Sequence, residues 1–294
     1  VPLPVDGKVL RIADVATVSR GYEDPPSYRI RHQGDPALML GIIMEKHWNG
    51  LDLDQSLKAQ EAKIQADLPL GAFARRVTDY LVHWAEATPD HSFLARREQL
   101  GTGKPLQTGD WQHVSYAQAL DAARSIGQAL LDRGLNAERP VVVLSENTIE
   151  HALLALGCMY AGVPYCPVSP AYATVSQDYD KLRHVIATLT PGLVFAADGA
   201  RYGKAIEATV AADVEVVLAQ GSIEGRTTLT FGSLKATPAT PAVDAAMHAT
   251  GPGTIVKFLF TSGSTKMPKP VINTQRMWCA NLQQISLSLP VLAE

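Results

Sequence analysis

The sequence predicts an α/β protein with an incomplete, doubly wound, mostly parallel sheet, preceded by a small α+β hairpin–helix unit. Three observations predict it. From about residue 73 to 290, short apolar runs typical of buried strands alternate with helical patterns. Capping residues, glycines and prolines separate these elements. Residues 1–70 lack this alternation and place a turn between two apolar runs instead.

The helices of the larger part are expected where apolar residues recur at helical spacing. Ser115 and Gln118 have the spacing of a capping box, and Gly134 ends the helix that they begin. Asn147 is expected to cap the next helix, which runs to about Tyr160. The buried stripe of the first helix is expected to comprise Tyr116, Leu120, Ala123, Gly127, Leu130 and Leu131. Other helices are expected over residues 75–87, 181–188, 202–212 and 275–286, the last capped by Thr274.

Strands are expected over residues 111–114, 141–144, 163–168, 193–197, 214–218 and 255–260. The last of these, 255–260, has the continuous apolar character of a buried parallel strand. Ligands of open parallel sheets bind at the carboxyl ends of the strands. The loop that follows residue 260 is therefore the expected site.

Residues 1–70 are expected to form one unit, and residues 71–294 a second. In the first unit a strand is expected over 15–18. Segments 28–32 and 37–44 flank the turn Gln33-Gly34-Asp35-Pro36, which indicates a hairpin. Asp52 is expected to cap a helix over 53–68.

Composition excludes several classes of function. The net charge is −3 and the isoelectric point is about 6.3, so no basic field recruits nucleic acid or an anionic membrane. The N-terminus has no signal-peptide pattern, and the uncharged stretch 152–168 is short for a membrane span and broken by Pro164 and Pro167. Cys158, Cys166 and Cys279 have no C-x-x-C spacing; reduced, buried thiols are expected, with no metal site, in a reducing, cytoplasmic compartment.

The stretch Thr261–Lys269 carries the expected chemistry. Its hydroxyls and consecutive backbone N–H groups can surround an anion, Gly263 allows close approach of the backbone, and Lys269 adds positive charge. A strand, a loop and the helix after Thr274 are a setting in which nucleotide phosphates bind. The candidate phosphate ligands are Thr261, Ser262, Gly263, Ser264, Thr265 and Lys269.

This loop is not a Walker A loop. Gly263 and Lys269 have the right separation, but Pro268 and Pro270 stand where that pattern has glycine and Ser/Thr, and proline has no N–H to donate. From residue types alone, a polar surface loop remains the alternative, because clusters of Gly, Ser and Thr between elements are common.

The run from Phe258 to Val271 resembles the phosphate-loop signature of the adenylate-forming superfamily, which includes acyl- and aryl-CoA synthetases, peptide-synthetase adenylation domains and luciferases. Its continuation to Met277 is most similar to feruloyl-CoA synthetases. The resemblance covers residues 72–294 and includes two earlier blocks, around 111–134 and 145–172. It departs from the family at Lys266, where glycine is usual, and at Pro270, where glycine or alanine is usual. A positive φ at Lys266 would add strain of roughly 1 kcal/mol.

The resemblance implies an ATP-dependent acid–CoA ligase. Such an enzyme activates a carboxylate, here of hydroxycinnamate type, to an acyl-adenylate, uses Mg²⁺, and passes the acyl group to CoA. The six candidate loop residues would then hold the phosphates of ATP. No catalytic residue is identified, because the family's metal-binding glutamate, hinge and C-terminal lysine lie beyond the point that matches Glu294. The chain alone is therefore expected to be inactive, and its incomplete sheet to favour self-association through exposed edges.

Residues 1–70 resemble the porter domain of resistance-nodulation-division efflux pumps over Arg11–Ala16, Gly21–Pro26 and Gly34–Gly41. The two resemblances meet near residue 70, which indicates a fusion. Two other functions stay open: a fragment of an efflux transporter, and a non-catalytic binding or structural fusion product. His151 and His184 are expected to be helix residues and not catalysts.

Overall fold

A computed structural model describes residues 3–5, 8–10, 31–32, 35–36, 70–100, 107–261 and 267–288 of the protein. The chain divides into two compact units, Val1–Gly71 and Ala72–Glu294. Among the described residues, no helix is long and apolar enough to cross a membrane.

The described part of the first unit consists of two short antiparallel pairs. β1 (Leu3–Val5) pairs with β2 (Lys8–Leu10), and β3 (Arg31–His32) pairs with β4 (Asp35–Pro36). The expected hairpin is present at β3 and β4, but its second strand begins inside the expected turn, at Asp35, and not after it. The strand expected over 15–18 and the helix expected over 53–68 lie outside the described residues.

The second unit is built on a mostly parallel sheet, as the sequence predicts. Its strand order is β11-β10-β9-β7-β8-β12-β13. All neighbouring pairs are parallel except β12 and β13, which are antiparallel. The strands are β7 (Val141–Leu144), β8 (Tyr165–Pro167), β9 (Leu193–Asp198), β10 (Glu215–Gln220), β11 (Leu229–Thr230), β12 (Ile255–Phe260) and β13 (Pro270–Thr274).

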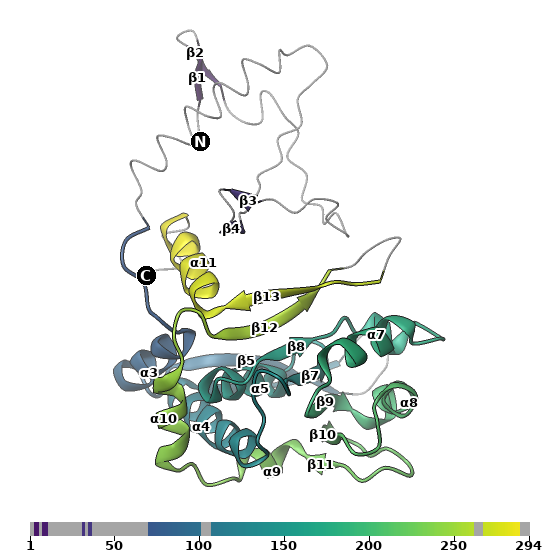
Figure 1. Ribbon diagram of the computed structural model, residues 1–294. Coiled ribbons are helices and arrows are strands. Elements are labelled where there is room, and N and C mark those ends of the chain that lie inside the picture. The colour runs from purple at the N-terminus through teal and green to yellow at the C-terminus, as the bar shows by residue number, and fades with distance from the viewer. Residues whose placement is uncertain are drawn as a thin grey trace. The chain divides into compact units, whose positions relative to one another are not determined.

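Helices cover both faces of this sheet (Figure 1). Successive residues of β7 point to opposite faces: Val141 and Val143 belong to one hydrophobic cluster, and Val142 and Leu144 to the other. The first cluster contains residues of α4 (Tyr116–Asp132), α5 (Ile149–Ala161), α9 (Phe231–Lys235) and α10 (Pro241–Ala249). The second contains residues of α6 (Ala171–Thr174), α7 (Asp180–Leu189) and α8 (Gly199–Thr209). The sheet is therefore doubly wound.

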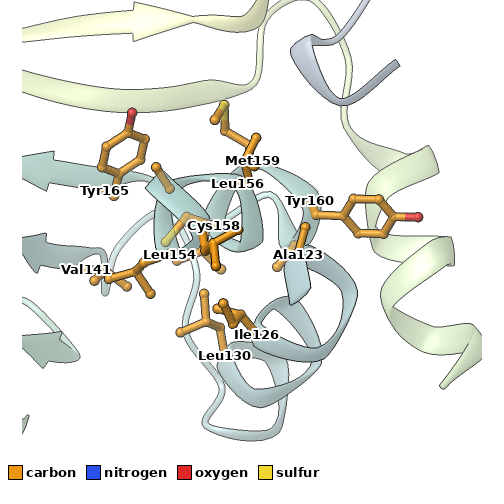
Figure 2. Close-up of a cluster of buried hydrophobic side chains, with 14 of the residues drawn as sticks. Ala123, Ile126, Leu130, Val141, Leu154, Leu156, Cys158, Met159, Tyr160 and Tyr165 are labelled. Atoms are coloured by element: carbon orange, nitrogen blue, oxygen red, sulfur yellow. The ribbon is translucent and has the colours of Figure 1, made fainter. Parts of the chain in front are cut away.

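The first cluster is densest where α4 packs on α5. Figure 2 shows Ala123, Ile126 and Leu130 of α4 directed toward Leu154 and Cys158 of α5. All five side chains are fully buried. Tyr116, Leu120 and Leu131, expected in the α4 stripe, are only partly buried, and the buried face instead includes Ala119, Ala122, Ile126 and Ala129. Tyr116, Leu120 and Leu131 pack at the margin of the first cluster, so the expected stripe is present, but it is centred on the smaller residues that face α5.

The capping signals have two different outcomes. The Ser115–Gln118 capping box is confirmed: the Gln118 N–H donates to Ser115 Oγ at 3.3 Å, and the Ser115 N–H donates to Gln118 Oε1 at 2.9 Å. The prediction of Asn147 as the cap of α5 was wrong by one residue. Thr148 is the cap, because its extended backbone (φ −114°, ψ 162°) lets its Oγ1 accept the His151 N–H at 3.1 Å.

A two-stranded antiparallel sheet precedes α4 in the sequence. α3 (Val77–Ala87) leads into β5 (Ser92–Leu100), which pairs with β6 (Gln107–Ser115). The strand expected over 111–114 is the end of β6, whereas β5 is not predicted. Register shifts between Ser92 and Leu94 and between Arg97 and Gln99 interrupt its alternation of side chains, so the pattern along the sequence is lost.

Helices expected over 181–188 and 202–212 are present as α7 and α8, with α8 starting three residues early. Asp198 caps α8 by accepting the Arg201 N–H at 3.1 Å. The final helix, α11 (Gln275–Ser288), begins where expected, and Thr274 Oγ1 accepts the Met277 N–H at 3.4 Å.

Candidate functional site

The candidate site is the connection between β12 and β13. The last paired residues of the two strands are Phe260 and Pro270. The next two residues, Thr261 and Lys269, are also bonded to each other and form the neck of the loop. The Thr261 N–H donates to the Lys269 carbonyl oxygen at 3.0 Å. The Lys269 N–H lies 3.4 Å from Thr261 Oγ1 and can donate to it. The first and last of the six predicted ligands are thus brought together.

The remaining predicted ligands, Ser262, Gly263, Ser264 and Thr265, lie outside the described residues, as does Lys266. Their part in the site therefore stays a prediction.

The local setting differs from the one expected. The sequence predicts strand, loop and helix, and a buried parallel strand over 255–260. The structure inserts β13 between the loop and α11, which makes the loop the tip of an antiparallel hairpin. Within β12 only Val256 is buried, and the parallel pairing with β8 is limited to Lys257 opposite Tyr165. The strand over 255–260 is present and pairs parallel with β8, but the expectation that it is buried is wrong, and its longer pairing is the antiparallel one with β13.

This hairpin explains why proline is accepted at position 270. Pro270 is the first residue of β13, and β13 is the edge of the sheet among the described strands. Proline lacks an N–H, so it is tolerated at the start of an edge strand. The departure at Pro270 is thus compatible with a properly formed neck.

Lys269 combines a fixed backbone with an exposed side chain. Both its N–H and its carbonyl group lie against Thr261, while its side chain is exposed. Because Thr261 follows β12, and β12 runs parallel to β8, the neck lies at the carboxyl edge of the parallel sheet. A cationic side chain held there can meet an anion in solvent.

His184, on α7, reaches this loop from a distant part of the sequence. Its Nε2 lies 2.9 Å from the carbonyl oxygen of Pro268. Its ring meets the ring of Phe260 edge-on, with centroids 6.2 Å apart. The sequence predicts His184 only as a helix residue, which it is. No local signal reveals the contact, since its partners lie more than seventy positions away along the chain.

Polar residues at the ends of β7, β9 and β10 form a network at the same sheet edge. Gln220 Nε2 donates to Asp198 Oδ2 at 2.7 Å, and Arg201 forms an ion pair with Glu146 at 2.5 Å. Asp198 also caps α8. These contacts join the ends of β9 and β10, the start of α8 and the residues after β7 at the carboxyl edge of the sheet.

Burial shifts the pKa of two titratable groups, Lys257 of β12 and His151 of α5. Burial lowers the pKa of His151, and the nearby Lys257 lowers it further. Burial also lowers the pKa of Lys257, whose Nζ lies 4.0 Å from the centre of the Trp278 ring. The Nδ1 of His151 lies 3.1 Å from the Glu146 carbonyl oxygen. Among the described residues, no group of three or more His, Cys, Asp or Glu side chains could hold a metal ion.

Comparison with known proteins identifies relatives of the second unit. Residues 81–292 match the profile of a protein family described as AMP-binding enzyme. Bacitracin synthase 1 of Bacillus licheniformis is 23% identical over 206 residues, which cover 69% of this chain and 3% of that protein. HC-toxin synthetase of Cochliobolus carbonum is 24% identical over 187 residues, which cover 64% of this chain and 3% of that protein.

Solved structures share the fold. The crystal structure of VinN aligns with a TM-score of 0.52 and 20% identity, covering 76% of this chain and 49% of VinN. The adenylation domain of a keto acid-selecting NRPS module, bound to keto acyl adenylate, aligns with a TM-score of 0.54 and 21% identity, covering 75% of this chain and 36% of that one. The chain thus spans half or less of the length of these relatives.

Proposed function

Because the chain belongs to the AMP-binding enzyme family, we propose that it is the N-terminal part of an ATP-dependent ligase that activates a small carboxylate as an acyl-adenylate. The observation that carries this proposal is the closed neck of the loop. Thr261 and Lys269 bond to each other at the carboxyl edge of the sheet and leave the Lys269 side chain exposed. This arrangement suits an anionic ligand.

In the proposed reaction, a carboxylate oxygen attacks the α-phosphorus of ATP. The bond from that phosphorus to the bridging oxygen breaks, giving acyl-adenylate and pyrophosphate. Negative charge develops on the leaving pyrophosphate, and Lys269 with the loop amides and hydroxyls of Thr261, Ser262, Gly263, Ser264 and Thr265 would bind it. Such pre-arranged donors lower the barrier most when they face developing charge. Mg²⁺, when bound to the nucleotide, would supply further neutralisation of phosphate charge.

Calorimetry with MgATP tests the role of the loop. We expect the parent chain to bind MgATP and Lys269→Ala to raise the Kd about tenfold or more, since a charge-assisted contact to phosphate contributes on the order of 1.5 kcal/mol or more. Lys235→Ala is the matched control, because Lys235 is exposed at the end of α9, away from the loop. A parent chain that binds no MgATP, or equal binding by both variants, would contradict the proposed role.

A narrower proposal concerns the substrate and the acyl acceptor. The resemblance of Val271–Met277 to feruloyl-CoA synthetases supports a hydroxycinnamate as the carboxylate and CoA as the acceptor. Release of AMP by the purified chain, measured with ATP and ferulate in the presence and in the absence of CoA, tests both assignments. Release of AMP that requires ferulate but not CoA would contradict the proposal that CoA is the acyl acceptor.

The two-unit organisation leads to a separate proposal. We infer that residues 1–70 are a porter-like segment joined to an adenylate-forming unit over 71–294. The porter resemblance in the sequence supports this fusion. The alternative of an efflux-transporter fragment is not favoured, because the AMP-binding match covers residues 81–292. Mass spectrometry of the native gene product checks the fusion: peptides that span residues 68–74 are expected, and two separate products would refute it.

Two further proposals follow for the chain in the cell. The buried reduced thiols support a reducing, cytoplasmic location. β13 is the edge of the sheet among the described strands, and an edge strand supports self-association through sheet edges. Light scattering after gel filtration is expected to show a mass that increases with concentration, and a constant monomer mass would exclude the association.

A further inference from the structure

We propose that His184 is a positioning residue for the phosphate loop: it fixes the carbonyl of Pro268 and thereby sets the position of Lys269. This inference rests on the proposed function of the loop for its consequence in binding. Its geometric part, the fixing of the loop backbone, can be tested without any ligand.

The contact is made at Pro268, the one buried residue among the described positions 267–269. Pro268 is buried, whereas Met267 and Lys269 on either side are exposed. A buried carbonyl without a partner is unfavourable by about 1–3 kcal/mol. The His184 Nε2–H donates to this carbonyl at 2.9 Å. The bond therefore fixes the chain one residue before the proposed phosphate ligand.

His184 contacts both limbs of the loop at once. Its edge-on ring contact is with Phe260, the last residue of β12 and the residue before Thr261. Its hydrogen bond is with Pro268, the residue before Lys269. The pair Thr261–Lys269 closes the neck of the loop. His184 therefore contacts the residue that precedes each member of this pair. It can set the separation and twist of the two limbs.

The rest of α7 is held in place without His184. Leu182, Val185, Ile186 and Leu189 of this helix are buried in the second hydrophobic cluster. His184 itself is only partly buried. A change at His184 should therefore leave the helix where it is and act on the loop. A purely structural role would instead appear as a loss of global stability.

Two substitutions separate the hydrogen bond from the ring contact. His184→Phe keeps an aromatic ring against Phe260 and removes the donor. His184→Gln loses the ring and keeps a side-chain N–H that can reach a carbonyl oxygen. His248→Leu is the matched control, since His248 is also a helix histidine, on α10, whose Nδ1 lies 2.7 Å from a backbone carbonyl, that of Asp244.

Hydrogen exchange of the Thr261 amide is the first measurement, because that N–H is bonded to the Lys269 carbonyl. We expect His184→Phe to speed its exchange about tenfold, and His184→Gln and His248→Leu to leave it near the parent rate. Urea unfolding of each variant shows whether global stability has changed. Equal exchange in His184→Phe and the parent overturns the proposal. So does equal acceleration in the Phe and Gln variants, since the donor would then not matter.

Calorimetry with MgATP is the second measurement. His184→Phe is expected to raise the Kd about threefold to tenfold, with His184→Gln close to the parent. If the parent binds no MgATP while His184→Phe still speeds exchange at Thr261, the proposed function fails and the positioning role stands. If the parent binds MgATP and His184→Phe binds it equally well, the positioning of Lys269 is refuted while the proposed function stands.

Discussion

Gly127 of α4 lies directly against Gly157 of α5. A Cβ atom placed on Gly127 would lie 3.2 Å from the Gly157 carbonyl oxygen. A Cβ atom on Gly157 would lie 2.5 Å from Cγ2 of Ile126, well inside van der Waals contact. The two helices thus cross at a point where neither has room for a side chain. This close crossing is why small residues line the buried face of α4.

Gly157→Ala should therefore destabilise the protein although alanine favours helix. Helix propensity predicts a gain of about 1 kcal/mol, whereas overpacking in a filled core typically loses about 1–3 kcal/mol. We expect a net loss, because Cβ and Cγ2 of Ile126 both lie too close to the added methyl group. Urea unfolding at neutral pH measures the difference.

Gly232→Ala is the control for this substitution. Gly232 is exposed in α9, and a Cβ there would meet only Thr230 Oγ1, at 3.7 Å. The control is expected to be neutral or slightly stabilising. If the Gly157→Ala protein is as stable as the Gly232→Ala protein, α4 and α5 can move apart without lowering the free energy of unfolding.

Local signals predicted those parts of the fold whose causes are local. The Ser115–Gln118 capping box and the four aliphatic residues of β7 are each specified within a few positions, and both are present as expected. The alternation of strands and helices also predicted the parallel sheet. Boundaries moved by a residue or more where two capping side chains compete, as at Asn147 and Thr148.

Features that depend on a distant partner were not predictable from the sequence. β13 is a strand because β12 lies beside it, and an edge strand that begins with Pro270 has few strand signals of its own. The contact of His184 with Pro268 likewise exists only after α7 has packed on the sheet. The sequence motif begins at Thr261 and ends at Lys269, so it predicted the two residues that form the neck of the loop. It did not predict that these residues lie at the end of an antiparallel hairpin.

Asp244 of α10 bonds to side chains of α4 and α5. Replacing it should lower the free energy of unfolding by an amount that depends on pH. It forms two bonds with Arg124 of α4, at 2.9 and 2.6 Å, and accepts the hydroxyl of Tyr160 of α5 at 2.8 Å. Figure 2 shows Tyr160 directed away from the core. Because both side chains of the ion pair are about one third exposed, solvent screens it, and we expect Asp244→Asn to lose about 1 kcal/mol at neutral pH.

The sign of the pH dependence follows from the pKa of Asp244. The Arg124 guanidinium lowers that pKa below its ordinary value of 3.8, with a further contribution from the Tyr160 hydroxyl. The stabilisation is therefore fully present above the unfolded pKa and is lost as the pH falls through the lower folded value. Urea unfolding of parent and variant should give a constant difference from about pH 7 to 5 that narrows below about pH 4. A difference that grows on acidification would contradict this.

The three thiols should be unreactive in the folded protein. Cys158, Cys166 and Cys279 are buried and free. Burial raises the pKa of each thiol, to about 12 for Cys166 and about 11 for Cys279. Little thiolate then exists near neutral pH, and the reagent has no access. Ellman's reagent is expected to label the native protein at least roughly tenfold more slowly than the urea-unfolded protein; rapid labelling of one native thiol would show that it becomes exposed by local opening.

Gln275, the first residue of α11, should contribute to stability through one hydrogen bond that its buried side chain accepts. It is 1% exposed, and its Oε1 accepts the N–H of Val77, the first residue of α3, at 3.0 Å. N–H groups in the first turn of a helix have no partner within the helix. Gln275→Leu would leave the Val77 N–H without its acceptor, which is expected to reduce the free energy of unfolding by about 1–3 kcal/mol.

Gln284→Leu is the matched control, because Gln284 is exposed on the same helix. Urea unfolding of both variants separates the lost bond from the general effect of replacing glutamine with leucine. Faster amide exchange at Val77 in the Gln275 variant would locate the effect at the start of α3. Because the Gln275 N–H bonds independently to the Thr254 carbonyl at 3.0 Å, α11 itself should stay in place. Equal stability of the two variants would mean that the Val77 N–H finds water or another acceptor, and that this side chain does not hold α3 to α11.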